Sequence, residues 1–483
     1  MITAEIQTAF SNYVDLTVAE LSAGEVRPDS ASILLERVGI LEGTDVFRQL
    51  VDATQRAFPA DGIWIMNMWR SELENFFRRT GFYEDIYAGR QSLSTEALLQ
   101  KYKACLEQND RQVRYLAPID AIDFGITHFD LGDFSIRKFS VEQIDDLFEN
   151  SRRKIFYPAS IIQSKNLADY WCLDVTIRTD RPSHDSPIDW DFSPSFQKEI
   201  SSFPKPIENA LKKLVLFDWQ FIQTIEAPSN HTKTHWEPGK GWCRFYVPAV
   251  LSMTDDLFSH PGGSLVIPPI DEELRHVGED GEEEIWVPSY LSMSDEERDQ
   301  LTTLIARLNE LIPRLTAHKK WLFLDVASGF IMKAFFSEGL EQLLWHIAVV
   351  ESLLGENKEG LTGLLARRVA CITGEARRDR PAIMEAFEEL YSFRSNLVHG
   401  NREILDQNKI YVSHLRQARQ IARKTLMWFL DWLDIVERQF AEKPCVAGLP
   451  ERTDLLSVLD MNGGRRSRVN WLIDNLSGKF PKF

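Results

Sequence analysis

The stretch LYSFRSNLVHGN, residues 390–401, places an arginine and a histidine five positions apart, just before a glycine. A guanidinium carries a fixed positive charge, while an imidazole can accept and donate a proton near neutral pH. Arg394 and His399 are therefore candidates for acid–base chemistry at an anionic group such as a phosphate. The spacing alone is not specific, because His399 before Gly400 also suits an ordinary helix C-terminus, where a cation interacts favourably with the dipole.

Arg394 lies on the apolar face of a helix that the residue spacing predicts over residues 381–398. Phe387, Leu390 and Leu397 recur on that face at helical intervals, so the arginine interrupts a hydrophobic stripe. A guanidinium keeps its charge, and burying it without a partner would cost several kcal/mol. We therefore expect Arg394 to meet a carboxylate, an anion or a water-filled groove.

Glu351 is the expected carboxylate partner of Arg394. It shares the inward face of a helix predicted over residues 339–354 with aliphatic side chains. Arg367 and Arg368, on the intervening helix, compete for the same carboxylate. A buried pair of Arg394 and Glu351 can also be purely structural, since such pairs often fix the register of two helices without doing chemistry.

Helix geometry limits what Arg394 and His399 can do within one chain. Five residues along an ideal helix turn the second side chain about 140° away from the first. The two side chains therefore converge in one of two ways. Either the last turn unwinds at Gly400, or two copies of the chain meet and each supplies part of one pocket.

The region after Ser294 is predicted to be helical almost to the end of the chain. Ser294 is a good N-cap, with Glu297 three residues later to complete a capping box. Helices are expected over residues 295–317, 321–337, 339–354, 359–373, 381–398 and 412–440. Short breaks join them, and these lengths suit an antiparallel all-α bundle over residues 294–445.

The remainder of the chain is predicted to form three further regions. Residues 1–110 carry helical periodicity and form the expected N-terminal helical region. Residues 111–293 contain short β-branched and aromatic runs between turn residues, with helices near 141–150 and 205–214, which is typical of an α+β domain. We assign this domain a regulatory or sensing role. Residues 446–483 form a basic extension, and the predicted fold class of the whole chain is α+β.

The 483-residue chain has a formal net charge of -17, which by itself argues against a nucleic-acid partner. The charge is unevenly distributed, because residues 381–483 hold 15 Lys or Arg against 13 Asp or Glu. The acidic segment, residues 271–299, instead holds twelve acidic residues and two arginines. The total charge therefore says little about any one face of the molecule.

The other signals mainly exclude classes of protein. Five scattered cysteines without a CxxC pair favour reduced thiols over disulfides or zinc. The sequence shows neither a long apolar run nor a signal peptide, so we expect a cytoplasmic protein without a membrane partner. His231 and His235 have a spacing that holds a metal on a helix, but Pro228 and Pro238 favour a loop. We predict neither a metal nor another cofactor.

The C-terminal part of the chain resembles the HEPN superfamily, specifically its Apea-like branch. The signature of that branch is an arginine, four intervening residues and a histidine, as in FRSNLVHG. Two further segments, AFFSEGLEQLLWHIAVVESLLGE (334–356) and LTGLLARRVACITG (361–374), recur there in the same order and spacing. The resemblance covers residues 295–440, with a looser likeness upstream in RYLAPID, GDFSIRKFS and SLVIPPI.

This resemblance implies a HEPN-type α-helical bundle that forms a homodimer, with two copies of the motif facing one groove. Many HEPN domains are metal-independent endoribonucleases, so Arg394 and His399 are the implied catalytic pair and RNA is the implied substrate. Glu351 would orient Arg394. Ser395 stands where the superfamily often has Asn, Asp or His, and Asn396 would donate to phosphate.

Apea-like HEPN proteins are associated with bacterial abortive infection, an anti-phage defence. The resemblance therefore implies a toxin that cleaves tRNA or other RNA after a phage-derived trigger. Domain order and charge motivate the hypothesis that the upstream region, or the acidic segment acting as an RNA mimic over the groove, holds this toxin inactive. Arg367, Arg368, Arg465, Arg466 and Arg468 are the expected further RNA contacts, although an arginine run beside two glycines is more often a solvated link. The alternative is a non-catalytic HEPN module that binds nucleotide or protein.

Overall fold

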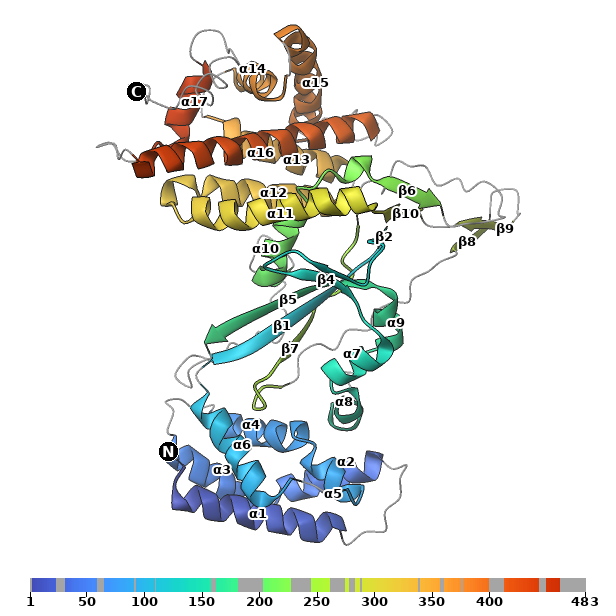
Figure 1. Ribbon diagram of the computed structural model, residues 1–483, viewed down its shortest axis with the longest axis vertical. Helices are drawn as coiled ribbons and strands as arrows, with labels where there is room; N and C mark the ends of the chain where they lie inside the picture. The colour runs from blue at the N-terminus through green and yellow to red at the C-terminus, as the bar shows by residue number, and fades with distance from the viewer. Residues whose placement is uncertain are drawn as a thin grey trace.

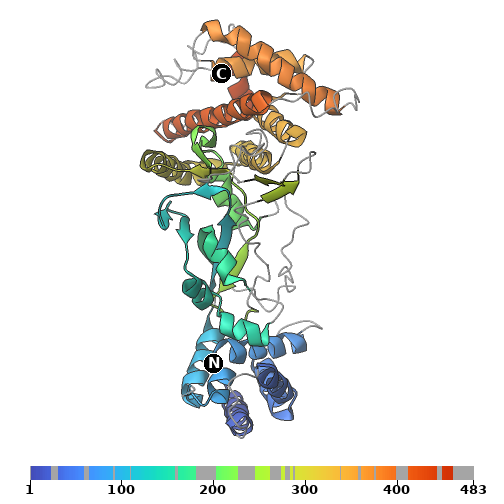
Figure 2. The same ribbon diagram turned by 90° about the vertical axis from the view of Figure 1, so that its right-hand side faces the viewer.

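The molecule is elongated and has three parts, with the N-terminal helices at one end, a β-sheet in the middle and the C-terminal helices at the other end (Figures 1 and 2). It is a mixed α+β protein, as expected, with a small antiparallel sheet and many helices. The computed structural model describes residues 2–22, 31–58, 65–90, 93–108, 110–157, 162–180, 203–226, 245–260, 274–277, 283–286, 289–337, 339–356, 360–374, 377–398, 412–442 and 449–460.

The N-terminal part consists of helices packed around an aromatic core. The helices are α1 (Ala4–Ser22), α2 (Ala31–Glu42), α3 (Asp45–Ala57), α4 (Ile65–Arg79), α5 (Phe82–Tyr87) and α6 (Thr95–Glu107). The side chains of Thr44 and Ser94 cap α3 and α6 by accepting backbone N–H groups of their first turns. The core of this part also takes in Phe156, Tyr157 and Phe258 from the middle of the chain.

A five-stranded antiparallel sheet forms the middle part, in the order β3-β4-β5-β1-β7. Its strands are β1 (Asp110–Ile119), β3 (His128–Asp130), β4 (Ser135–Lys138), β5 (Trp171–Asp180) and β7 (Leu251–Thr254). Side chains alternate between the two faces of the sheet. Helices α7 (Val141–Leu147) and α9 (Ser164–Asp169) pack against one face, and α10 (Lys205–Leu214) packs against the other.

The helix expected over residues 141–150 is divided in two. Helix α7 ends at Leu147, and α8 (Asn150–Phe156) follows it. Between them Glu149 has a φ of 50°, in the left-handed region. Because a left-handed residue does not continue an α-helix, the chain changes direction at this point. The helix expected near residues 205–214 is confirmed as α10.

Two smaller sheets accompany the main one. Strands β2 (Ile122–Asp123), β10 (Ser289–Ser292) and β6 (Gln223–Glu226) form a three-stranded sheet in the order β2-β10-β6. Strands β8 (Leu274–Val277) and β9 (Glu283–Trp286) form an antiparallel pair within the acidic segment. This pair lies beside β6 and β10, on the sheet side of the C-terminal helices (Figures 1 and 2).

The C-terminal part is helical from Asp295 onward in the described residues. Its helices are α11 (Asp295–Thr316), α12 (Phe323–Phe336), α13 (Gly339–Leu354), α14 (Leu361–Thr373), α15 (Arg380–Val398), α16 (Val412–Glu442) and α17 (Arg452–Asp460). The expected helices from α11 to α16 are confirmed with ends within two residues, and the capping box of Ser294 and Glu297 is present. Helix α17 was not expected, because it lies in the stretch assigned to the basic extension.

One hydrophobic core runs from the sheet into the C-terminal helices, across the boundary expected at residue 294. Buried residues of the sheet and α10 belong to the same cluster as the buried residues of α11 to α17. Helix α10 adds polar links: Lys212 Nζ lies 2.7 Å from Asp325 Oδ1 of α12, and Lys213 Nζ lies 2.7 Å from Asn309 Oδ1 of α11. The middle part and the C-terminal helices are therefore packed as one body.

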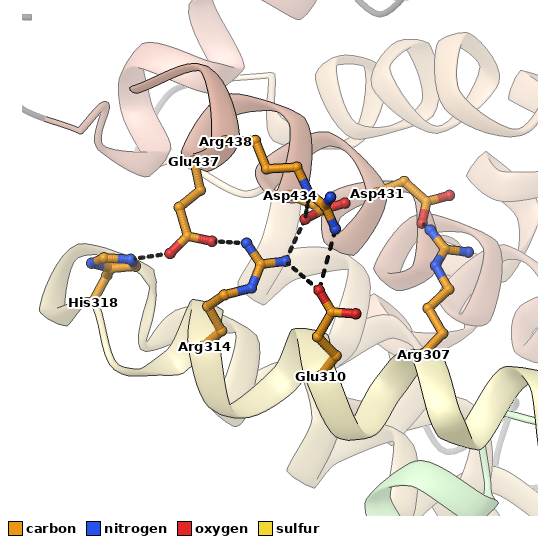
Figure 3. A network of polar contacts seen from close by, with 8 residues as sticks. All are labelled: Arg307, Glu310, Arg314, His318, Asp431, Asp434, Glu437 and Arg438. Carbon is orange, nitrogen blue, oxygen red and sulfur yellow. Dashed lines mark hydrogen bonds and ion pairs between the residues drawn. The ribbon is translucent and has the colours of Figure 1, made fainter. Parts of the chain in front are cut away.

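A row of charged side chains joins α11 to α16 on the surface (Figure 3). Arg314 pairs with both Asp434 and Glu437, and His318 Nε2 lies 2.6 Å from Glu437 Oε1. Arg438 lies 2.8 Å from Asp434 and so extends the row. The alternation of acid and base across the two helices fixes how they lie against each other.

In the described part of the chain, no helix combines the length and apolarity needed to cross a bilayer.

Candidate functional site

The expected pair of Arg394 and Glu351 is present. Arg394 Nη2 of α15 lies 3.2 Å from Glu351 Oε2 of α13, and the two side chains are 30% and 24% exposed. Phe387 and Leu390 on the same face of α15 are fully buried, which anchors the helix so that Arg394 emerges at the edge of the core. The pair is thus neither sealed in the interior nor free in solvent.

Tyr391 is the third member of the site. Its hydroxyl donates to Glu351 Oε1 at 2.8 Å, and the Arg394 guanidinium carbon lies 5.7 Å from the centre of its ring. Burial, together with the neighbouring Glu351 carboxylate, raises the pKa of Tyr391 to about 12. The phenol is therefore protonated at neutral pH and donates to the carboxylate.

The last turn of α13, which carries Glu351, is held by backbone contacts on its outer side. Gly355 N–H donates to Glu351 O at 2.8 Å, and a Cβ added at Gly355 would lie 2.5 Å from that same oxygen. Arg452 of α17 donates to Ser352 O and Gly355 O, two carbonyls at the end of the helix. Because helix ends leave carbonyl groups without internal partners, the guanidinium of Arg452 acts as a cap for this turn.

Arg368 does not compete for Glu351. Its side chain is 1% exposed, and its guanidinium pairs with Asp460 and Glu356 and donates to the backbone carbonyl of Leu354. The pairs with Asp460 and Glu356 outweigh the effect of burial and raise its pKa. The structure thus gives Arg368, expected as an RNA contact, a structural role in the interior.

Arg367 is half-exposed, with Nη2 3.6 Å from Asp460 Oδ1, so its contact is a weak surface ion pair. The guanidinium of Arg367 remains accessible to solvent at the outer face of α14. Ser395 and Asn396 are half-buried next to Arg394 on α15. Their proximity to Arg394 follows from the helix itself.

Several predicted residues lie outside the described part of the chain. These residues are His399, Arg465, Arg466, Arg468, His231 and His235. The structure therefore bears on the arginine half of the motif, at the end of α15, and on its carboxylate partner.

His346 is fully enclosed, one helical turn and a residue before Glu351 on α13. Its side chain is 1% exposed, and its Nδ1 atom has no hydrogen-bond partner among the described residues. Burial, with a further effect from the nearby Arg419 charge, lowers the pKa of His346 to about 3. The imidazole is therefore neutral and belongs to the core.

The acidic segment does not cover Arg394 through its described strands. Strands β8 and β9 lie on the sheet side of the C-terminal helices, whereas α15 lies on the far side of α16 from the sheet (Figures 1 and 2). Within one chain, this pair of strands is therefore remote from the Arg394 end of the molecule.

Sequence reasoning missed three residues at this site, namely Tyr391, Arg452 and Asp460. A signal existed for Tyr391, which precedes Arg394 by three positions and therefore lies on the same helix face. Neither Arg452 nor Asp460 had such a signal, because both reach α13 and α14 from a helix far along the chain. Among the described residues, no group of three or more His, Cys, Asp or Glu is placed to hold a metal ion.

Comparison with protein-family models, with curated proteins and with solved structures returned no match. The chain is therefore described by its own fold and its own site. It is a mixed α+β protein whose C-terminal helices hold an arginine, a glutamate and a tyrosine in contact at the edge of the core.

Proposed function

We propose that this chain is a metal-independent endoribonuclease of the HEPN superfamily, in its Apea-like branch. The observation that carries the proposal is the Arg394–Glu351 ion pair, half-buried near the C-terminal end of α15 and five residues before His399. The order of helices α11 to α16 supports the same assignment. A HEPN-type bundle is the proposed fold of residues 294–445.

The proposed reaction is an attack of a ribose hydroxyl on the neighbouring phosphate. A base removes the 2′ hydroxyl proton, the 2′ oxygen bonds to phosphorus, and the P–O5′ bond breaks as an acid protonates the leaving oxygen. Arg394 neutralises the charge of the phosphorane, and His399 supplies proton transfer. The products are a 2′,3′-cyclic phosphate and a 5′ hydroxyl, and DNA resists cleavage because it lacks the attacking group.

The proposal requires a homodimer formed through the C-terminal helices. Arg394 lies inside α15, so a side chain five positions later on a regular helix would point about 140° away from it. Two protomers facing each other resolve this, since each supplies one arginine and one histidine to a shared groove. Arg367, half-exposed on α14, is a proposed RNA contact beside that groove.

The direct test compares wild type, Arg394→Ala and His399→Ala on total RNA in the presence of EDTA. Wild type is expected to cleave and both variants to lose cleavage while keeping the same oligomeric state. The melting temperature should stay unchanged in His399→Ala and fall in Arg394→Ala, which leaves the half-buried Glu351 without its cation, so His399→Ala is the more informative variant. His128→Ala, at an exposed position on β3, is the matched control and should cleave like wild type. Cleavage by all four proteins, or by none, contradicts the proposed catalytic pair.

A non-catalytic HEPN module is the second candidate, and one observation favours it. Tyr391 and Arg394 together join α15 to α13 through Glu351, which is also what a purely structural joint between helices would require. In that case, wild type would bind RNA or nucleotide without changing it. Chain-length analysis of the recovered RNA separates binding from cleavage.

In biology, we place the proposed enzyme in the cytoplasm, as a toxin of bacterial anti-phage defence with tRNA or another RNA as target and a phage-derived trigger. A ribonuclease of this kind must be restrained. Because β8 and β9 are remote from α15 of their own chain, an acidic lid would have to act on the partner protomer. Deleting residues 271–290 should raise toxicity on expression, and unchanged growth would contradict the lid.

A further inference from the structure

The carboxylate of Glu351 is divided between two donors from α15. Its Oε1 accepts from the hydroxyl of Tyr391 at 2.8 Å, and its Oε2 accepts from Arg394 Nη2 at 3.2 Å. Tyr391 and Arg394 are three positions apart, one turn along the same helix face. The tyrosine therefore occupies the oxygen that a second arginine N–H group would otherwise take.

The same chain shows what an arginine does when both carboxylate oxygens are available. Arg114 donates to Asp174 through Nε at 2.7 Å and through Nη2 at 2.6 Å, each bond to a different oxygen. Such two-point pairing is the usual and stronger geometry for arginine and a carboxylate. Arg394 instead makes one hydrogen bond to one oxygen of Glu351, whose side chain is 24% exposed where that of Asp174 is 7% exposed.

The single contact leaves most of the Arg394 guanidinium uncommitted. An arginine carries five N–H donors, and within the described part of the chain Glu351 Oε2 is the one acceptor of Arg394. The ring of Tyr391 flanks the guanidinium at 5.7 Å and limits its rotation. The side chain that carries the remaining donors lies at the edge of the core and is 30% exposed.

We propose that Tyr391 is a positioning residue, which keeps the Arg394–Glu351 pair at a single contact so that the other edge of the guanidinium serves the scissile phosphate of RNA. The role rests on the proposed ribonuclease function. Tyr391 does not touch substrate in this role. It prevents Glu351 from accepting two hydrogen bonds from Arg394. A two-point ion pair of that kind would neutralise the guanidinium that has to stabilise the phosphorane.

The test removes the hydroxyl and keeps the ring. Tyr391→Phe should lower kcat about tenfold with KM within about twofold, because the loss falls on a charge that forms only in the transition state. Tyr13→Phe, which removes a buried, hydrogen-bonded hydroxyl from the N-terminal core, is the matched control and should leave kcat unchanged. An unchanged kcat in Tyr391→Phe would overturn the proposal.

A second pair of variants separates positioning from general stability. In a Glu351→Gln background the side chain can no longer form a closed ion pair with Arg394, so adding Tyr391→Phe should change kcat by less than about twofold. An equal tenfold loss in both backgrounds would mean that the hydroxyl acts independently of Glu351. That result would also overturn the proposal.

An activity-free measurement distinguishes failure of this inference from failure of the proposed function. In protein labelled with ¹⁵N-arginine, Tyr391→Phe should shift the Arg394 Nε–H resonance and slow its exchange with water, because Nε–H gains a carboxylate acceptor. If that change appears in a protein that never cleaves RNA, the pairing inference stands and the ribonuclease assignment fails. An unchanged resonance overturns the inference whatever the activity.

Discussion

Arg368 and Asp460, on α14 and α17, form a two-point ion pair that closes the C-terminal helix over the rest of the bundle. Arg368 Nε lies 3.0 Å from Asp460 Oδ1, and Nη2 donates to Oδ2. Asp460 was assigned to a basic extension from the sequence, yet it neutralises one of the most buried charges of the chain. The short helix α17 is thus an integral element and not an appendage.

Asp460→Asn should destabilise the protein by about 2 kcal/mol. Leaving a buried charge with no partner costs roughly 3–5 kcal/mol, and the cost here is smaller because Glu356 still pairs with Arg368. The measurement is the free energy of unfolding in urea. Asp45→Asn, which breaks an exposed pair with Arg48, is the control and should change that free energy by less than about 0.5 kcal/mol. Equal effects of the two substitutions would contradict the structural role of α17.

Gly355→Ala should disturb the turn that carries Glu351. The added Cβ would lie 2.5 Å from Glu351 O, so the backbone must move, at a cost of about 1–3 kcal/mol. Gly363→Ala, on α14, meets no atom within 4 Å and should instead stabilise the protein by about 0.5–1 kcal/mol, because alanine is the better helix former. Melting temperatures of the two variants should therefore move in opposite directions.

His346 should make the protein less stable as the solution becomes acidic. Its pKa is lowered to about 3 in the folded state, against about 6.5 in an unfolded chain. Between these values the unfolded state binds a proton that the folded state does not, so stability is fully present above pH 6.5 and falls as the pH drops toward 3. The slope from this residue approaches about 1.4 kcal/mol per pH unit.

His346→Phe removes that titration. The difference in unfolding free energy between variant and wild type should shift in favour of the variant as the pH is lowered from 6.5 to 4.5. If the unfolding free energies of wild type and His346→Phe change in parallel over this pH range, the prediction that His346 takes up a proton on unfolding is wrong.

The lysines of α10 should couple the sheet to the C-terminal helices. Lys212→Met leaves Asp325 of α12 and Glu208 of α10 without their shared ammonium group. Hydrogen exchange should therefore rise in both α10 and α12. Lys205→Met is the control, because Lys205 is half-exposed and pairs with Glu208 of its own helix alone among the described residues, and it should leave exchange in α12 unchanged. Faster exchange confined to α10 would contradict the coupling.

Local patterns predicted the helices of the C-terminal part well. Apolar spacing, the Ser294 cap and short breaks are all properties of neighbouring residues, so the ends of α11 to α16 could be placed before any tertiary contact was known. The pairing of Arg394 with Glu351 was also accessible, because each charge interrupts an apolar stripe. Two such interruptions on adjacent helices predict one another.

Features that depend on distant segments could not be predicted in this way. The partner of Arg368 comes from α17, and the division of α7 from α8 depends on a left-handed Glu149 that no local residue preference signals. The boundary expected at residue 294 follows a change of sequence texture, whereas the core is continuous because α10 and the sheet bury their apolar faces against α11 and α12. The local pattern of residue types indicates secondary structure, but it does not indicate which helices and strands share one hydrophobic core.

That continuous interior has a consequence for how such a molecule can be controlled. Cutting the backbone near residue 294 would leave complementary apolar surfaces on the two fragments. The fragments would therefore stay associated or aggregate, and the C-terminal helices would not be released from the rest of the chain. Activation by proteolytic release of the C-terminal helices is therefore disfavoured by the architecture. A switch has to act by shifting contacts within an intact chain. The N-terminal helices have a core of their own, but Asn75 and Arg79 of α4 bind the backbone at Thr254 and Phe258, so a movement of these helices would pull on the end of β7.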